Sequence, residues 1–269
     1  MLHRAAAACV LFAACGAADG VLRESRPFVD EPYPVLDTAL GERFVREEFV
    51  TADGVHVPFR LLSPRGDAPE PRPLVVVLHG SGAIGADNEK QLGPFARAWA
   101  SPAVADAFPA FVAVPQVAAR SADYAPWRDG DLASRPGPSL SSLLALVDAL
   151  RTREGVDGSR VYLVGVSMGG SAALAAATLR PDAFAGLVVF GAIAPPRDLA
   201  AAALRTPVWF EHGDADAENP IGSVRAWAKV LAAHGASPRF VEYTGMDHRV
   251  SAAALLAHDW RVWLFAQRR

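Results

Sequence analysis

The stretch Val161-Tyr162-Leu163-Val164-Gly165-Val166-Ser167-Met168-Gly169 joins an apolar run to a serine flanked by small residues, and an alanine-rich stretch follows it. The apolar run predicts a buried strand, and the alanine-rich stretch predicts a helix that ends before Pro181. Glycines permit a tight bend between the two that holds the Ser167 hydroxyl clear of the backbone. The stretch therefore predicts a strand–turn–helix unit with a candidate nucleophile at its apex, although an ordinary turn containing serine is the alternative.

Similar apolar runs recur along the chain and alternate with helical patterns. The runs at residues 74–78, 110–114, 161–164, 187–190 and 208–210 are typical of strands buried on both faces, and residues 239–243 are a further candidate strand. Helical patterns cover residues 140–150, 168–179, 219–235 and 251–266, with Ser139 and Asn219 as expected N-caps. Strands that alternate with helices predict an α/β fold with a doubly wound, mostly parallel sheet.

Three further segments complete the predicted architecture. Residues 44–50 and 55–62 alternate in polarity around Asp53-Gly54, which predicts an N-terminal antiparallel hairpin. Residues 191–206 leave room for one small helix at most, so we expect no large cap domain. Residues 115–138 form the longest irregular segment, and we expect this loop to set substrate specificity.

Composition limits the function classes that fit this chain. Its 269 residues are 51% hydrophobic, which suits one globular domain with a substantial core. The net charge of −3 gives no basic face for nucleic acid, so none is expected as a partner. No apolar stretch reaches the roughly 18 residues that a transmembrane helix needs.

The N-terminus reads as an export signal. A short basic region, Met1 to Arg4, precedes an apolar run that ends at Ala14, directly before Cys15. This pattern resembles the lipobox of bacterial lipoproteins, which implies that Cys15 carries the lipid. A plain signal peptide cut elsewhere is the alternative.

The expected domains follow from that pattern. Residues 1–14 are the lipoprotein signal peptide, residues 15–42 a tether, and residues 43–269 the catalytic domain. The protein is then exported and held in the cell envelope, or secreted, with a lipid anchor as its only contact with a membrane. The sequence carries no indication of the oligomeric state.

A serine hydroxyl is a weak nucleophile, so it needs a base within hydrogen-bond distance and an acid that orients the base. In open α/β sheets such groups collect beyond the carboxyl ends of strands. Downstream of Ser167, only residues 208–216 and 240–248 offer an acid and a histidine there. They predict His248 as general base and Asp216 as the orienting acid, in the chain order typical of α/β-hydrolases.

Several residues compete with these assignments. Asp214 is the alternative acid, whereas Asp247, adjacent to His248, is expected to face solvent. His79 is expected to support a loop, and His212 to be packed structure. The spacing of the histidines offers no metal site.

The remaining candidates surround the nucleophile. The backbone N–H groups of Met168 and Ser81 are the expected oxyanion donors, the second from the loop after residues 74–78. Trp127 either lines the substrate pocket or pins a loop.

The chain resembles a known branch of the α/β-hydrolases over residues 43–267. The matching motifs are residues 78–89, which read Leu-His-Gly-Ser-Gly-Ala-Ile-Gly-Ala-Asp-Asn-Glu, Ser167 to Gly170, His212 to Asp216, and Tyr243 to His248. They are similar to secreted esterases often labelled "predicted peptidase", near the polyhydroxybutyrate-depolymerase-like and feruloyl-esterase-like proteins. Many such proteins carry Glu-Arg where Ala83 and Ile84 stand here, so the resemblance leaves the substrate preference open.

The resemblance implies a serine-dependent carboxylic ester hydrolase that works through an acyl-enzyme, needs no cofactor and takes a small-molecule or polymeric ester. A serine peptidase of the same fold is an alternative, although the chain lacks the length for a gating domain. A non-catalytic lipoprotein that binds a ligand in a hydrolase-like pocket is a second alternative.

Overall fold

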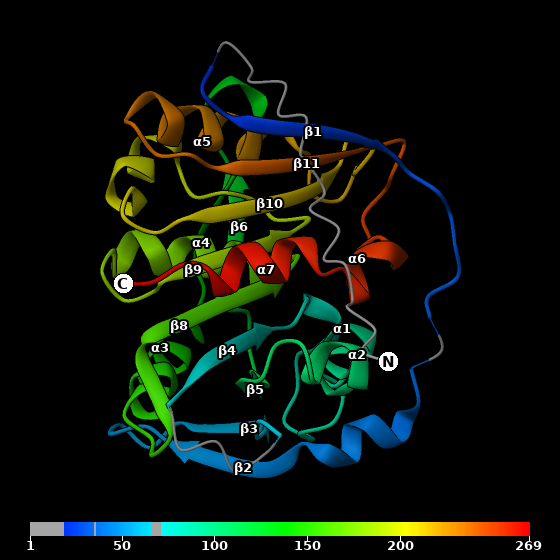
Figure 1. Ribbon diagram of the computed structural model, residues 1–269. Helices are drawn as coiled ribbons and strands as arrows, with labels where there is room; N and C mark the ends of the chain where they lie inside the picture. Colours follow the sequence, from blue (N-terminus) through cyan, green and yellow to red (C-terminus); the bar gives the residue numbers. More distant parts are fainter. Residues whose placement is uncertain (1–18, 35, 66–70) are drawn as a thin grey trace.

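A mostly parallel sheet forms the centre of the molecule in the computed structural model (Figure 1), which describes residues 19–34, 36–65 and 71–269. Within these residues nine strands lie in the order β1-β11-β10-β9-β8-β4-β5-β3-β2. Only β3 pairs antiparallel with its neighbours β2 and β5. The strands are β1 (Leu22–Pro27), β2 (Val45–Val50), β3 (His56–Leu62), β4 (Arg72–Leu78), β5 (Phe111–Pro115), β8 (Val156–Val166), β9 (Gly186–Phe190), β10 (Val208–Gly213) and β11 (Arg239–Thr244). The predicted fold class is therefore confirmed, including the N-terminal hairpin β2–β3.

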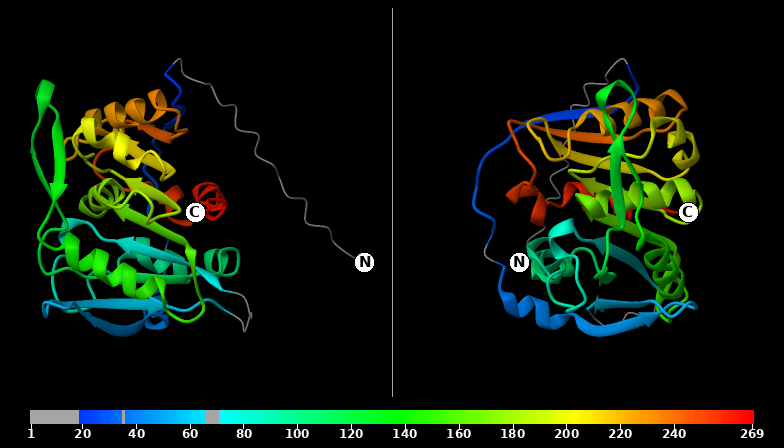
Figure 2. Two further views of the ribbon diagram at one scale, coloured as in Figure 1. Left: turned by 90° about the vertical axis from the view of Figure 1, so that its left-hand side faces the viewer. Right: turned by 180° about the vertical axis from the view of Figure 1, so that it is seen from behind.

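Helices cover both faces of this sheet, as Figure 2 shows edge-on. One face carries α3 (Leu140–Arg151), α4 (Met168–Leu179) and α5 (Gly222–Ala233). The other carries α1 (Pro94–Arg97), α2 (Pro102–Ala105), α6 (Ala252–Leu256) and α7 (Asp259–Phe265). Short 3₁₀ helices are η1 (Thr38–Arg43), η2 (Ser81–Ala83), η3 (Ala98–Ala100), η4 (Arg128–Gly130) and η5 (Arg197–Ala203). No helix in the described part of the chain is long and apolar enough to cross a bilayer.

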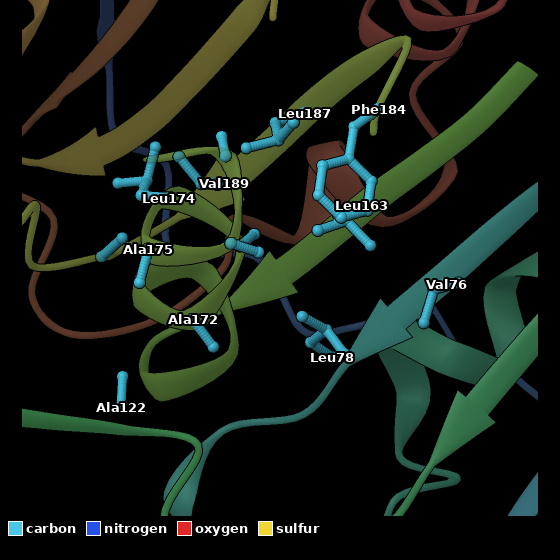
Figure 3. Packing of buried hydrophobic residues seen from close by; sticks show 14 of the residues in the cluster. Val76, Leu78, Ala122, Leu163, Ala172, Leu174, Ala175, Phe184, Leu187 and Val189 are labelled. Carbon is cyan, nitrogen blue, oxygen red and sulfur yellow. The ribbon is translucent and has the colours of Figure 1, made fainter. Parts of the chain in front are cut away.

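Alternate residues of the central strands face two separate cores. Leu163 of β8 and Val189 of β9 belong to the same core cluster as Ala172 and Leu174 of α4 (Figure 3). Their neighbours in the strands face the opposite core, which contains Trp99, Trp260 and Leu264. Because both faces are covered, the strands are apolar throughout, as their sequence runs predicted.

The segment predicted to be an irregular loop, residues 115–138, instead contains a hairpin. Strands β6 (Ala122–Pro126) and β7 (Leu132–Pro136) form a separate two-stranded antiparallel sheet. The Ser134 N–H donates to the Ala194 carbonyl at 2.8 Å, and Tyr124 Oη lies 3.2 Å from Ser171 Oγ. The β6–β7 hairpin stands beside α4, at the far left of the edge-on view in Figure 2. Its prolines and aspartates obscured the alternation that marks short strands.

Part of the predicted tether also belongs to the sheet. Residues Leu22 to Pro27 form β1, which pairs parallel with β11 along its whole length. β1 lies at the edge of the sheet, so most of its side chains are polar and partly exposed, and no apolar period indicates a strand. The predicted signal, residues 1–14, and Cys15 lie outside the described residues.

Two predicted helix boundaries are wrong, and one predicted N-cap, Ser139, stands at the expected position without a side-chain hydrogen bond. The helix predicted over residues 251–266 breaks at Ala257, where Arg261 donates to the carbonyls of Leu255 and Ala257 between α6 and α7. α5 begins at Gly222 with Ile221 as its N-cap, so Asn219 does not cap it. Ser139 precedes α3, but its side chain makes no capping hydrogen bond.

Replacing Gly169 with alanine should destabilise the protein, because a Cβ there would lie 2.2 Å from the Leu78 carbonyl oxygen. That neighbour is backbone and cannot rotate away, so we expect a loss of about 1–3 kcal/mol in the free energy of unfolding. Urea denaturation measures the loss. Gly93→Ala is the control, since nothing lies within 4 Å of its Cβ position. Equal stability of the two variants would contradict the prediction.

Candidate active site

Ser167 lies at the turn between β8 and α4 in a backbone conformation that side chains rarely adopt. Its φ is 55° and its ψ −119°, a strain of the order of 1–3 kcal/mol. The surrounding structure holds this turn: the Ser167 N–H donates to the Phe190 carbonyl at 2.8 Å, and the Ser171 N–H donates to the Ser167 carbonyl. A Cβ at Gly165 would lie 2.4 Å from the Gly169 carbonyl carbon. The strand–turn–helix unit predicted from the sequence is therefore present, and its glycines have no room for side chains.

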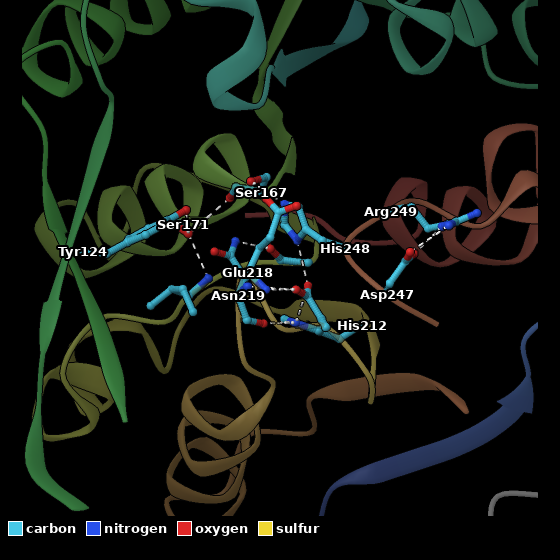
Figure 4. A network of polar contacts seen from close by, with 12 residues as sticks. Tyr124, Ser167, Ser171, His212, Glu218, Asn219, Asp247, His248 and Arg249 are labelled. Atoms are coloured by element: carbon cyan, nitrogen blue, oxygen red, sulfur yellow. Dashed lines mark hydrogen bonds and ion pairs between the residues drawn. The ribbon is translucent and has the colours of Figure 1, made fainter. Parts of the chain in front are cut away.

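His248 connects Ser167 to Asp216. Its Nε2 lies 2.9 Å from Ser167 Oγ, and its Nδ1 lies 2.7 Å from Asp216 Oδ2 (Figure 4). An ionised carboxylate can only accept, so Nδ1 carries the proton that is donated to Asp216. Nε2 of the neutral ring is then free to accept the Ser167 hydroxyl proton. Ser167 lies at the turn between β8 and α4, Asp216 in the turn after β10, and His248 in the loop after β11.

Asp216 is almost completely buried and fully hydrogen bonded. Its Oδ1 accepts the backbone N–H groups of Glu218 at 3.0 Å and Asn219 at 2.8 Å. Its Oδ2 accepts from His248 and lies 3.3 Å from His212 Nε2. Burial alone would raise the pKa of Asp216, but the hydrogen bonds from His212, His248 and Asn219 outweigh it and keep the pKa far below the usual range. The carboxylate is therefore ionised at neutral pH.

The charge of Asp216 in turn changes His248. The hydrogen bond with Asp216 raises the pKa of His248 above the ordinary value of histidine, against the opposite effect of burial. The imidazolium form is thereby stabilised, which is the form that a general base reaches in the transition state.

Two residues near this carboxylate had no functional role in the prediction. His212 is buried, and its Nε2 lies 2.8 Å from the Asn219 carbonyl oxygen. The Asn219 amide donates to the Gly191 carbonyl at 2.7 Å and so connects the Asp216 turn to the loop after β9. Gly191 packs against the His248 ring, which a Cβ at this position would meet at 3.5 Å. The sequence did signal His212 through the motif His212-Gly-x-x-Asp216. The motif alone did not show that this histidine reaches the Asp216 carboxylate.

The rival acids point elsewhere. Asp214 is exposed, and its Oδ1 accepts the Gly245 N–H at 2.7 Å, so it stabilises a turn. Asp247 faces solvent and pairs with Arg249, as Figure 4 shows. The structure thus brings Asp216, and neither alternative, to His248.

The loop after β4 lies against the nucleophile. A Cβ at Gly80 would be 3.5 Å from the Ser167 Cβ, and Ser81 opens the short helix η2 beyond it. Met168 is the first residue of α4, directly after Ser167. The backbones of both predicted oxyanion donors therefore belong to segments that adjoin Ser167.

A network of buried polar groups supports this loop. His79 Nε2 accepts the Val117 N–H at 3.2 Å, so the proton is on Nδ1, which donates to the Gly80 carbonyl at 2.7 Å. Burial lowers the pKa of His79, which favours this neutral form. The Gln116 amide donates to the Ala83 carbonyl and to Asp87 Oδ1, both at 3.1 Å. His79 thus supports the loop, and Gln116 is a second support that the sequence prediction had not assigned.

A cavity of about 380 Å³ extends from His248 and Gly80. Apolar side chains form much of its wall, with Tyr33, Phe95, Phe190, Val250 and Leu255 among them. Gln91 also lines it: its amide donates to Asn88 Oδ1, while its buried Oε1 has no partner among the described residues. This volume lies at the small end of the range for ligand sites, which is about 300–1,000 Å³.

Trp127 is not one of the residues that line this cavity. It follows β6 at the end of the hairpin, where its backbone N–H donates to the Asp131 carbonyl and its ring lies against Arg128. Within residues 19–34, 36–65 and 71–269, no group of three His, Cys, Asp or Glu side chains is placed to hold a metal ion.

The sequence also matches a known family of hydrolases. Residues 113–253 match the dienelactone hydrolase family. NocK of Nocardia uniformis subsp. tsuyamanensis, whose name assigns it to the esterases, is 32% identical over 245 residues, which cover 87% of this chain and 69% of NocK. A protein of Oryza sativa subsp. japonica, named as a probable inactive carboxylesterase, is 29% identical over 67% of this chain and 79% of its own length.

A solved structure of a thermostable esterase superposes with a TM-score of 0.76 and 27% identity. The match covers 86% of this chain but only 64% of the esterase chain, so this protein spans less than two thirds of that structure. The chain belongs to the dienelactone hydrolase family and has the α/β-hydrolase fold.

Proposed function

We propose that this protein is a serine-dependent hydrolase of carboxylic esters that acts through an acyl-enzyme. The observation that carries the proposal is the continuous hydrogen-bonded series from Asp216 through His248 to Ser167, at 2.7 and 2.9 Å. The esterase names of the similar proteins support an ester as the substrate. So does the resemblance of residues 78–89 to the secreted esterases of the polyhydroxybutyrate-depolymerase-like and feruloyl-esterase-like branch.

Acylation begins when His248 Nε2 takes the hydroxyl proton of Ser167 and Oγ bonds to the ester carbonyl carbon. Negative charge then develops on the carbonyl oxygen, where the backbone N–H groups of Met168 and Ser81 donate. Asp216 stabilises the imidazolium that forms. The C–O bond to the alcohol breaks, and the alcohol leaves with the proton from Nε2.

Deacylation repeats these steps with water. His248 takes a proton from the water as its oxygen bonds to the acyl carbon, and the same N–H groups donate to the oxygen that carries the new negative charge. The bond to Ser167 breaks, and Oγ recovers its proton from His248. The carboxylic acid is released with all groups of the protein restored.

A fluorophosphonate probe should label the wild-type protein and leave Ser167→Ala unlabelled, because the probe reacts only with an activated serine. Ser141→Ala is the matched control, since Ser141 is an exposed serine on α3. Gel fluorescence measures the labelling, and an ester panel then identifies turnover. An unlabelled wild type would favour the non-catalytic alternative, and cleavage of peptides but of no ester would favour the peptidase.

The rate should depend on pH through His248, which must be neutral to accept the Ser167 proton. Because Asp216 raises the pKa of His248, kcat/KM of the wild type should fall as pH decreases through a value above the ordinary histidine pKa of about 6.5. Asp216→Asn removes the charge that raises it, so the acid limb should move to lower pH and kcat should drop by about 10⁴-fold.

Asp214→Asn is the control for this profile, because the exposed Asp214 carboxylate contacts Gly245 and not His248. Its acid limb should coincide with that of the wild type. An acid limb that stays in place in Asp216→Asn would contradict the role given to Asp216.

The location of the protein is part of the same proposal and rests on the sequence pattern around Cys15. Expressed in a bacterium with an alkyne-tagged fatty acid, the wild type and Cys9→Ser should incorporate the label, and Cys15→Ser should not. Detection uses azide-linked fluorescence after gel electrophoresis. Label retained in Cys15→Ser would exclude the lipid on this residue.

A further inference from the structure

Residues 28–34, here called the N-terminal strap, run from the end of β1 toward η1. In Figure 1 this blue segment passes along the right-hand side of the molecule, beyond α6, on the side where the parallel strands end. The strap precedes the segment that the sequence marked as the hydrolase domain, yet it lies at the edge of the sheet where the active-site residues collect.

The strap is attached to the chain segment that carries His248. The Phe28 N–H donates to the Thr244 carbonyl at 3.1 Å, and the Arg249 guanidinium lies 5.3 Å from the centre of the Phe28 ring. Arg249 Nη1 pairs with Asp30 Oδ1 at 2.9 Å. Tyr33 Oη donates to the Val250 carbonyl at 2.9 Å. These contacts hold the strap on both sides of His248.

Tyr33 also belongs to the wall of the cavity beside His248. Tyr33 is 44% exposed, so it stands at the boundary between the cavity and solvent. The hydrogen bond to the Val250 carbonyl holds the phenol in place. No other strap residue lines this cavity among those described.

The cavity has no unpaired charge to offer a ligand. Of the charged side chains that line it, Arg249 is paired with Asp247 and Asp30, and Lys90 Nζ lies 3.5 Å from Asp87 Oδ2. Between them the wall contains the apolar side chains of Phe95, Phe190 and Leu255 and one uncharged polar side chain, Gln91. An uncharged, mostly apolar group is therefore the chemistry that this space accepts, because a charged group would be desolvated there without a partner.

We infer that the cavity holds an uncharged apolar acyl group of the ester and that Tyr33 is the specificity-determining residue that limits the length of this group. The inference rests on the proposed ester hydrolysis. The acyl group stays bonded to Ser167 after the alcohol has left, so the walled space beside Gly80 and His248 suits the part that stays. The alcohol must instead leave so that water can approach His248.

The test is the acyl-chain preference of Tyr33→Ala, measured as kcat/KM on p-nitrophenyl esters from acetate to decanoate. Alanine removes the part of the wall that the Tyr33 side chain forms and opens the cavity toward solvent there. The ratio of kcat/KM for decanoate to that for butanoate should rise by about tenfold or more over the wild type. Tyr33→Phe keeps the ring and loses only the hydrogen bond, so its ratio should stay within about twofold of the wild type.

Val29→Ala is a second control, because Val29 is an exposed strap residue that does not line the cavity. Its ratio should also match the wild type, and melting temperatures check that all three variants fold. An unchanged ratio in Tyr33→Ala would overturn the inference. The inference would also be overturned if Tyr33→Ala changed only the preference among butanoate esters of different alcohols.

Ligand binding separates this inference from the proposed function. In a Ser167→Ala background, straight-chain methyl ketones resemble the acyl part of an ester but are not cleaved. Longer ketones should raise the melting temperature more when Tyr33 is alanine than when it is tyrosine. If the wild type hydrolyses no ester, the proposed function fails while this binding difference still decides the inference. If the ketones raised the melting temperature equally with tyrosine and with alanine at position 33, the inference would be overturned.

Discussion

The close contact between the Gly169 backbone and the Leu78 carbonyl is the constraint on which the active site depends. It allows α4 to begin directly beside the end of β4, so that Ser167 adjoins the loop that follows that strand. The left-handed backbone of Ser167 is strained, and it persists because neighbouring strands hold it through the hydrogen bond to Phe190. Packing of two cores against one sheet thus supplies the energy that maintains the strained turn.

The hydrogen bonds and the charge of Asp216 are the second feature on which the site depends. Asp216 receives two backbone N–H groups and lies within reach of two histidines, so it is ionised although it is buried. Its charge raises the pKa of His248 and orients the ring toward Ser167. Asn219 and Gly191 then keep the turn and the ring in contact, which makes the carboxylate part of the rigid scaffold.

Sequence patterns predicted the strands, the elbow and the main candidate residues, because each leaves a local signal in apolar runs and glycine spacing. They did not predict β1 or the β6–β7 hairpin, because an edge strand and a small exposed sheet bury few side chains and show little period. The patterns also did not predict that the last helix is interrupted at Ala257, where Arg261 donates to carbonyl groups of the preceding turn. The choice between Asp214 and Asp216 remained open for a related reason: two residues in one turn can face opposite ways.

The sequence by itself determined the α/β architecture, the serine at a strand-to-helix turn and the order of Ser167, Asp216 and His248 along the chain. These follow from local chemistry within short segments. Only the tertiary structure decided that His212 reaches Asp216 and that Tyr33 lines the cavity beside His248. Tyr33 and Val250 are 217 positions apart, and a contact at that distance arises only when the folded sheet brings its first and last segments together.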